Sequence, residues 1–394
     1  MLAHTLQIVN YASISDAIQY EIENPEITLL PSGRIGISKE FERNSMHQFR
    51  DQIYAEEIHS YTEEFKHYFK RNKITTHTAP QENHFAQKLK KVFQDEWGIT
   101  LSEIDMVCHA ICMILLSENT SVKKISEQDF VQWLLQITDL NESKVQSFID
   151  KMKFLKRPQP LSPPSGFDKW EVHPWRFNRR LSYLHRPIIS LEEDGKEYLL
   201  LSARHLITAS ENLISILFNG TLKPDQFNKK IIQLLAEINK IKGKEYRDEV
   251  ASWLKENTNL KVYDYEIKIR PKGFFKDNQD KGDIDILAIN NSRNIIYSIE
   301  CKNTVQSKLT YDYRMEFDNY LGTNGKEGLI NKHINRHIWL ENNIEQVQLK
   351  LSLNEKPIIK SLVISKNILP LKHMKTVPIP VLSFYEIKTK QFTF

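Results

Sequence analysis

The sequence predicts an α/β domain at the C-terminal end, with a mixed sheet flanked by helices, preceded by a mainly α-helical N-terminal domain. Two apolar runs, residues 284–289 and 295–301, have the length and β-branched composition of buried strands. The chain before residue 155 instead shows apolar positions at helical spacing. Prolines crowd into residues 158–164, where no helix can continue. We therefore expect three parts: residues 1–155, 156–224 and 225–394.

Helical periodicity and polar residues at helix starts define the elements of the first part. A short hairpin is expected near residues 27–37, where Pro31 and Gly33 supply turn residues. Ser126 and Asn141 precede apolar patterns and are predicted to be N-caps. Helices are expected over residues 40–70, 82–97, 102–116, 127–136 and 143–155.

The middle part combines the proline-rich linker with a hairpin and a helix. Two strand-like runs within residues 187–201 turn at Asp194 and Gly195, a strong hairpin signal. A helix is expected over residues 204–218. Before the hairpin, arginines alternate with aromatic residues over residues 170–186. This pattern suits phosphate contact and base stacking, but packing of the aromatic rings on a neighbouring domain is the favoured interpretation.

The C-terminal part is predicted to place strands around a crossover helix. A long helix over residues 225–255 leads into it. The elements that follow are strands at residues 261–269, 284–289 and 295–301, a helix at roughly 326–351, and strands at 359–365 and 377–382. This order predicts a mixed sheet covered by helices. The turn residues at 290–294 predict that the second and third strands pair as an antiparallel hairpin.

Charged residues interrupt these two central strands. Asp285 lies in the first run, and Glu300 and Lys302 end the second. Successive side chains of a strand point to opposite faces, so Glu300 and Lys302 share a face, while Ile284 and Ile286 point together into the core. The hairpin then places Asp285 across from Glu300. Because buried charges need partners, we expect a divalent metal and a nucleic-acid phosphate here, as in metal-assisted phosphodiester hydrolysis.

These residues resemble the active-site signature of the PD-(D/E)xK nuclease superfamily, which has the restriction-endonuclease-like fold. Asp285 matches the first acidic position, and Glu300-Cys301-Lys302 matches the D/E-x-K element. The resemblance covers the C-terminal region only. It implies a phosphodiester hydrolase that uses Mg²⁺, for which Mn²⁺ can substitute. Asp285, Glu300 and the backbone carbonyl of Cys301 would hold the metal, and Lys302 would orient or deprotonate the attacking water.

Two positions depart from the superfamily pattern. Ile284 precedes the aspartate where the superfamily name has proline. Many members also carry an acidic residue after an aromatic residue on the preceding helix, whereas here Arg247 follows Tyr246. Glu249, on the margin of the apolar stripe of this helix, is our candidate for a supporting metal ligand, with Glu245 in reserve. A solvated helix surface is an equally good interpretation of both carboxylates.

The crossover helix carries basic and imidazole side chains at helical spacing. These candidates for contact with a phosphate backbone are Lys332, His333, Arg336 and His337. The alternative is a solvated face on which they form ion pairs with Glu341 or Glu345.

We therefore expect a Mg²⁺-dependent nuclease that acts on nucleic acid. A DNA endonuclease is favoured over an RNA nuclease, and restriction or phage defence would suit such an enzyme. The alternatives are a non-catalytic nucleic-acid-binding protein on a nuclease-like fold and an interaction protein in which the helical domain matters most. That domain remains available for recognition, for a partner or for homo-oligomerisation, although no heptad repeat is visible.

Composition excludes disorder and membrane insertion as general explanations of the chain. Its 394 residues, 40% hydrophobic and 26% charged, suit two or three globular domains, and a net charge of +4 is compatible with a polyanionic partner. No apolar run approaches the ~20 residues of a membrane span, so we expect no membrane partner and a cytoplasmic location. Three cysteines cannot build a disulfide framework, and Cys108 and Cys112 suit a buried helix better than a zinc site.

Overall fold

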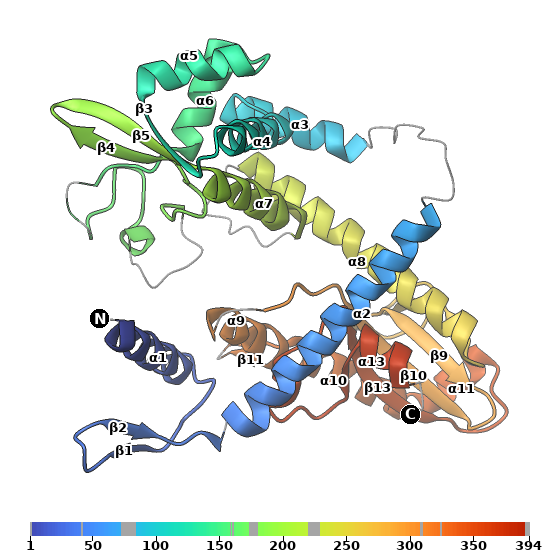
Figure 1. The fold of residues 1–394 in the computed structure, drawn as a ribbon. Coiled ribbons are helices and arrows are strands. Elements are labelled where there is room, and N and C mark those ends of the chain that lie inside the picture. Colours follow the sequence, from blue (N-terminus) through green and yellow to red (C-terminus); the bar gives the residue numbers. More distant parts are fainter. Residues whose placement is uncertain are drawn as a thin grey trace. The chain divides into compact units, whose positions relative to one another are not determined.

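The protein is a mixed α/β protein with several small sheets (Figure 1). The computed structural model describes residues 2–40, 42–71, 84–157, 159, 161–172, 180–219, 229–307, 310–323 and 325–390. Its contacts form two compact units. The sheet unit consists of Met1–Thr76 with Ile241–Phe394, and the helical unit consists of His77–Lys240. The first 76 residues, expected in the N-terminal helical domain, therefore group with the C-terminal part of the chain.

The helical unit holds most of the helices predicted for the first part of the chain. Its elements are α3 (His84–Trp97), α4 (Leu101–Ser117), β3 (Val122–Ser126), α5 (Glu127–Ile137), α6 (Glu142–Met152), a 3₁₀ turn (Lys169–Val172), β4 (Ile189–Glu193), β5 (Lys196–Ser202), α7 (Ala203–Asn219) and the first part of α8 (Lys229–Asn257). The observed helix ends lie within three residues of the predicted ones, except that α8 begins at Lys229. β3 was not predicted.

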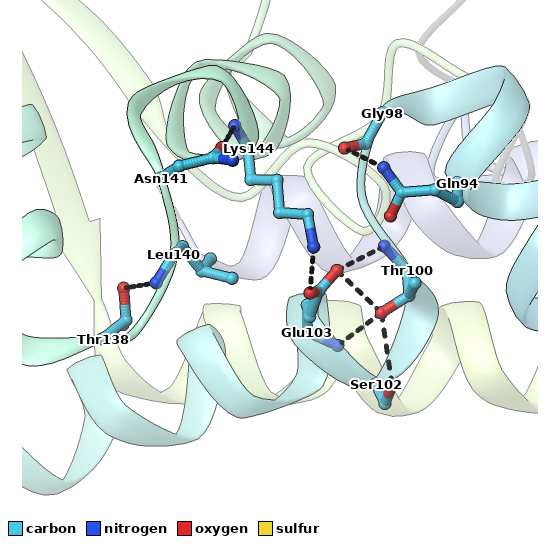
Figure 2. Close-up of polar contacts among 9 residues, drawn as sticks. All are labelled: Gln94, Gly98, Thr100, Ser102, Glu103, Thr138, Leu140, Asn141 and Lys144. Atoms are coloured by element: carbon cyan, nitrogen blue, oxygen red, sulfur yellow. Dashed lines mark hydrogen bonds and ion pairs between the residues drawn. The ribbon is translucent and has the colours of Figure 1, made fainter.

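Side-chain caps explain where two of these helices begin (Figure 2). Thr100 starts α4 with a capping box: its hydroxyl accepts a hydrogen bond from Glu103 N at 3.3 Å, and Glu103 Oε2 accepts one from Thr100 N at 2.9 Å. Lys144 of α6 donates to Glu103 Oε1 at 2.5 Å, which ties the two helices together. Asn141 caps α6 by accepting from Lys144 N at 3.0 Å. The predicted N-caps Asn141 and Ser126 are both confirmed.

A three-stranded antiparallel sheet, ordered β3-β5-β4, completes the helical unit. The predicted hairpin turns at Asp194 and Gly195, whose φ angles of +52° and +72° are those that a tight two-residue hairpin loop requires. The core lies between this sheet and the helices, and Cys108 is fully buried in it, as the apolar spacing predicted.

The sheet unit is assembled from both ends of the sequence. Its elements are α1 (Leu2–Gln19), β1 (Ile27–Leu29), β2 (Ile35–Ile37), a π-helical turn (Glu42–Met46), α2 (His47–Arg71), the last part of α8, β6 (Lys261–Tyr263), β7 (Ile267–Ile269), β8 (Gly282–Ile284), β9 (Ile286–Asn290), β10 (Ile295–Lys302), α9 (Thr310–Leu321), β11 (Gly322–Thr323), β12 (Lys326–Glu327), α10 (Leu329–Asn342), α11 (Ile344–Leu351), β13 (Ile358–Ser365), α12 (Leu371–Met374), β14 (Val381–Ser383) and α13 (Phe384–Lys390). The predicted hairpin of β1 and β2 is confirmed.

The N-terminal segment of this unit packs on its C-terminal segment through both apolar and polar contacts. Phe49 of α2 is 1% exposed, and its ring meets that of Tyr313 edge-on, with centroids 5.8 Å apart. Glu56, also on α2, accepts a hydrogen bond from Ile368 N at 3.1 Å and another from the hydroxyl of Ser383. These contacts make α2 a part of the sheet unit.

A five-stranded mixed sheet, ordered β14-β13-β10-β9-β6, forms the centre of this unit. β9 and β10 are the predicted antiparallel hairpin, and their last pair is Ile286 with Ile299. The crossover through α9, α10 and α11 returns the chain to β13, which runs parallel to β10, and β14 runs parallel to β13. The predicted mixed sheet is therefore present.

Helices or other apolar segments cover both faces of β10. Tyr297 and Ile299 pack with residues of α8, including Val250, whereas Ile296 packs with Trp339 and Leu340 of α10. A strand buried on both faces has apolar residues at nearly every position, which explains why residues 295–301 form a mostly apolar run. Charged residues are unusual in a strand of this kind, so Glu300 and Lys302 are exceptions within β10.

Three predicted elements are interrupted in the structure. The strand expected over residues 261–269 is two strands, because β6 pairs with β9 while β7 pairs with β8 in a separate sheet. The crossover helix breaks at Asn343, where α10 ends and α11 begins. The chain also bends at Asp285, between β8 and β9. Because this bend breaks the alternation of side chains, Ile284 and Ile286 pack in different apolar clusters, and the prediction that they share a face is wrong.

Among the described helices, none has by itself the length and apolar composition needed to cross a membrane. The segments Gln87–Trp97 and Leu101–Ser117 would meet those criteria jointly, but they are bent by 77° relative to each other.

Candidate active site

Asp285 lies where the ladder between β9 and β10 ends. Since Ile286 pairs with Ile299, the next position brings Asp285 opposite Glu300. Oδ2 of Asp285 accepts a hydrogen bond from the backbone N of Cys301 at 2.7 Å. The carboxylate thus binds a backbone N–H group that β9 no longer reaches, and buried N–H groups need such a partner.

Glu300 lies between two cations. Its side chain is 9% exposed, Nζ of Lys302 lies 2.8 Å from its Oε1, and Nη2 of Arg336 donates to its Oε2 at 2.5 Å. Lys302 shares the sheet face of Glu300, as the alternation of β10 predicted, and its side chain is 35% exposed. The structure therefore brings together Asp285, Glu300 and Lys302.

Two residues of α10, His333 and Arg336, lie beside Glu300. His333 is fully buried, and its Nε2 lies 3.1 Å from the backbone oxygen of Ser298. A carbonyl oxygen can only accept, so Nε2 carries the proton, and burial lowers the pKa of His333 to about 4, which keeps the ring neutral. Nδ1 is then an acceptor, 3.3 Å from Nη2 of Arg336. The same guanidinium nitrogen thus contacts both His333 and Glu300.

The site perturbs the ionisation of two of its members. Burial, reinforced by the nearby charge of Glu300, raises the pKa of Asp285 to about 6. Burial acts in the opposite sense on Lys302, but the ion pair with Glu300 and the charge of Asp285 outweigh it, so the pKa of Lys302 lies above its usual value. Lys302 is a cation at neutral pH. With both carboxylates ionised, the formal charges of Asp285, Glu300, Lys302 and Arg336 sum to zero.

The structure does not bring Glu249 to this pair of carboxylates. Its side chain is 56% exposed, and its Oε1 lies 3.7 Å from Nζ of Lys388 on α13. Among the described residues, no group of three or more His, Cys, Asp or Glu side chains is arranged to hold a metal. The solvated-surface interpretation of Glu249 fits this placement, and Glu245 is also exposed.

The four candidates for phosphate contact do not share one exposed face. His333 and Arg336 are buried against β10, where they contact Ser298 and Glu300. Lys332 is exposed. His337 is half-buried, with Nδ1 3.0 Å from Oγ of Ser361 and Nε2 3.5 Å from Glu341, a partner that the alternative interpretation named. Contact with phosphate remains a prediction for Lys332 and His337.

Sequence reasoning missed the role of Arg336 as the partner of Glu300. The available signal was the three-residue spacing of His333 and Arg336, which puts both on one face of α10. Arg247, which replaces the acidic residue expected on α8, is also buried. Its Nη2 lies 2.7 Å from Asp248 and its Nη1 3.1 Å from Glu266, and the charges of these two carboxylates and of Asp285 raise its pKa despite burial.

Another buried carboxylate lies on α9. Glu316 accepts hydrogen bonds from Oγ of Ser307 at 3.0 Å and from Leu371 N at 3.3 Å, and burial raises its pKa to about 7. The hydroxyl of Tyr320, one turn further along α9, is buried and has no hydrogen-bond partner among the described residues. Burial and then the charges of Glu316 and Glu300 raise the pKa of Tyr320, so this helix also faces the region of Glu300.

Asp285 and Glu300 are the residues that could hold a metal ion here. Mg²⁺ is usually bound by one or two carboxylates, while waters and substrate phosphates complete its shell. Asp285 and Glu300 meet that requirement, with the backbone carbonyl of Cys301 as the further oxygen ligand expected from the sequence. Both oxygens of Glu300 contact cations, so a metal ion at Glu300 would have to displace at least one of these contacts.

The fold and the site define an α/β protein that carries paired acidic and basic side chains at the end of a central β-hairpin. Over residues 1–382, the chain matches the family model described as "Upx-like: Anti-phage protein Upx-like". The chain therefore belongs to the Upx-like family of anti-phage proteins, which indicates a role in phage defence. No curated protein and no solved structure matches it.

Proposed function

We propose that this protein is a metal-dependent nuclease of the PD-(D/E)xK type that cleaves nucleic acid, DNA in preference to RNA, during phage defence. The convergence of Asp285, Glu300 and Lys302 at the end of the β9–β10 hairpin carries the proposal. The mixed sheet around them is the architecture that the restriction-endonuclease-like fold requires. Membership of an anti-phage family supports the defence role.

Each residue has a distinct part in the proposed reaction. Asp285 and Glu300 would hold Mg²⁺, or Mn²⁺ in its place, which would neutralise phosphate charge and make water a stronger nucleophile. Lys302, held as a cation by Glu300, would orient the attacking water and stabilise the negative charge that develops on the phosphate. Because its pKa is raised, Lys302 remains protonated, and this favours the stabilisation of charge over the abstraction of a proton from water.

Arg336 fixes the carboxylate of Glu300 through the hydrogen bond from its Nη2 to Oε2. The guanidinium is buried, and Gly282 lies beside it: a Cβ added at Gly282 would be 3.4 Å from Nη1 of Arg336. A buried cation of this kind orients Glu300 and balances its charge when no metal is bound. Arg336 is thus a positioning residue in the proposed enzyme.

One observation favours a second candidate function, a nucleic-acid-binding protein without turnover. Glu300 is already paired with both Lys302 and Arg336, and the described residues provide no third acidic side chain for a metal. In this alternative the charged residues of the site would stabilise the fold, and a nucleic acid would bind without being cut. These residues are Asp285, Glu300, Lys302 and Arg336.

A cleavage assay distinguishes the two functions. Duplex DNA, single-stranded DNA and RNA would be incubated with the full chain in Mg²⁺, in Mn²⁺ and in EDTA. We expect metal-dependent cleavage by the parent protein, with DNA preferred. Asp285→Asn and Lys302→Met should each reduce the rate by at least a hundredfold, because each removes a group that contacts the reacting atoms.

Glu249→Gln is the matched control, since it neutralises an exposed carboxylate on α8 outside the site. It should cleave at the parent rate. Equal cleavage by the parent and by both site variants would show contamination and defeat the nuclease proposal. Binding of DNA without cleavage under every metal condition would establish the second function.

A further inference from the structure

The helical unit contains a cavity of about 230 Å³, and all the described residues that line it belong to this unit. It lies where α3, α6 and α7 meet the segment before β4. The residues that matter for its chemistry are Trp97, Lys151, Phe167, Arg180, His185 and Arg186. Three of these side chains are cations and two are large aromatic rings, a combination that the sequence pattern over residues 170–186 only partly revealed. Residues 173–179 of that pattern lie outside the described residues.

The cations of this cavity repel one another. Arg186 donates hydrogen bonds to the backbone oxygens of Asp150 and Lys153, at 2.8 and 2.9 Å, and these neutral acceptors fix the guanidinium without cancelling its charge. Burial and then the charge of Arg180 lower the pKa of Arg186. Burial and then the charge of Arg186 lower the pKa of Lys151. An anion placed between Lys151 and Arg186 would relieve this repulsion.

Nearby carboxylates act on these cations to different extents. Glu171 is fully buried and accepts from both the backbone N and the side chain of Arg180, so it accounts for that arginine. Asp150 and Glu96 act on Lys151 from further away, in the direction that favours its charged form. Asp150 and Glu171 act in the same direction on Arg186, but burial and the neighbouring cations outweigh the carboxylates, so the pKa values of Lys151 and Arg186 both remain lowered.

The aromatic residues hold these cations in place and provide a flat apolar surface. The guanidinium of Arg180 lies 4.5 Å from the ring centroid of Phe167, and that of Arg186 lies 5.9 Å from it. Nζ of Lys151 lies 5.5 Å from the ring centroid of Trp97. Guanidinium planes and aromatic rings are the surfaces on which nucleobases stack.

His185 adds a buried polar atom to the cavity. Its Nε2 is buried and has no hydrogen-bond partner among the described residues. Burial, and then the charge of Arg186, lower the pKa of His185 to about 4, so the ring is neutral at pH 7. A neutral imidazole offers one donor and one acceptor, which suits the polar edge of a heterocyclic ring.

We propose that this cavity binds a small phosphorylated ligand with a planar ring, the chemistry of a mononucleotide. Lys151 and Arg186 would hold the phosphate, the arginine planes and Phe167 would contact the ring, and His185 would bind its polar edge. The volume lies below the ~300 Å³ at which pockets for drug-sized ligands begin, so a single nucleotide fits better than a strand. The inference does not depend on the proposed nuclease activity.

Calorimetric titration of the full chain tests this inference at low ionic strength and without divalent metal. The probes are AMP, GMP, CMP and UMP, with adenosine and inorganic phosphate as the two partial ligands. At least one monophosphate should bind, and adenosine and phosphate should each bind at least tenfold more weakly than the best monophosphate. Lys151→Met should weaken that binding about tenfold or more while keeping the backbone contacts of Arg186.

Arg204→Gln is the matched control, because Arg204 is an exposed cation of the same unit outside the cavity. It should bind like the parent. Arg186→Gln gives a second test of the phosphate site if circular dichroism shows it folded. The inference would be overturned by the absence of binding for all four monophosphates at millimolar concentration, by equal affinity for phosphate and the best monophosphate, or by parent-like binding in Lys151→Met.

Discussion

Asp285→Asn should stabilise the metal-free protein while abolishing the proposed cleavage. Burial and the neighbouring Glu300 raise the pKa of Asp285 from 3.8 to about 6, which means that the folded protein resists the ionised form. One pKa unit corresponds to about 1.4 kcal/mol, so at neutral pH the ionised carboxylate lowers the free energy of unfolding by up to about 3 kcal/mol. Asparagine removes that charge and keeps an oxygen for the N–H of Cys301.

The sign of the pH dependence follows from the same shift. Between pH 4 and 6 the folded state binds the proton of Asp285 more tightly than the unfolded state, so the stability of the parent falls as pH rises through this window. The advantage of Asp285→Asn should therefore be near zero at pH 4 and complete by pH 7.

Thermal unfolding in EDTA across pH 4 to 8 measures this effect. For a unit of this size, 1 kcal/mol shifts the Tm by roughly 2–4 °C, so the variant should gain up to about 6–12 °C at pH 7. Glu249→Gln, on an exposed carboxylate, should change the Tm by no more than about 1 °C. A variant less stable than the parent at pH 7, or a difference that does not vary with pH, would refute the reasoning. Added Mg²⁺ should raise the Tm of the parent and leave that of Asp285→Asn unchanged.

Three further substitutions test how the site and its surroundings are held. Arg336→Met leaves buried Glu300 with Lys302 as its ion-pair partner and should lower the free energy of unfolding by roughly 3 kcal/mol, measured in urea. Gly282→Ala places a side chain at φ +88° beside Arg336 and should cost about 1 kcal/mol or more in the same assay, whereas parent-like stability would show that the strain is relieved. Thr100→Ala removes the capping box of α4 and should cost about 1 kcal/mol, and Thr100→Ser should restore most of it.

Local features of the fold followed from the sequence because they depend on neighbours along the chain. The caps at Ser126 and Asn141 and the hairpin turn at Asp194 need only a few adjacent residues, and each is present. The same is true of Glu300 and Lys302, which share a face because the period of a strand is two. The placement of Glu300 beside Lys302 was therefore predictable from a short segment of sequence.

Features that depend on packing between distant segments could not be predicted from the sequence. The contact of Arg336 with Glu300 joins residues 36 positions apart, and it exists because α10 packs across β10. The bend at Asp285 arises where β8 and β9 join different sheets, a division that alternation alone cannot indicate. The grouping of α2 with the C-terminal segment rests on contacts such as that of Glu56 with Ile368, which are more than 300 residues apart in sequence.

The assembly of the sheet unit from Met1–Thr76 and Ile241–Phe394 has a consequence for how the chain acquires its structure on the ribosome. All residues of the helical unit emerge before the central hairpin is translated, so that unit can fold first. The partners of α2 arrive only with the last part of the chain, and until then the apolar side of α2 around Phe49 needs protection from aggregation. Truncation before residue 368 would remove Ile368 and Ser383, the hydrogen-bond partners of Glu56, together with the later members of the apolar cluster around Phe49, so a chain shortened in this way should aggregate more readily through α2.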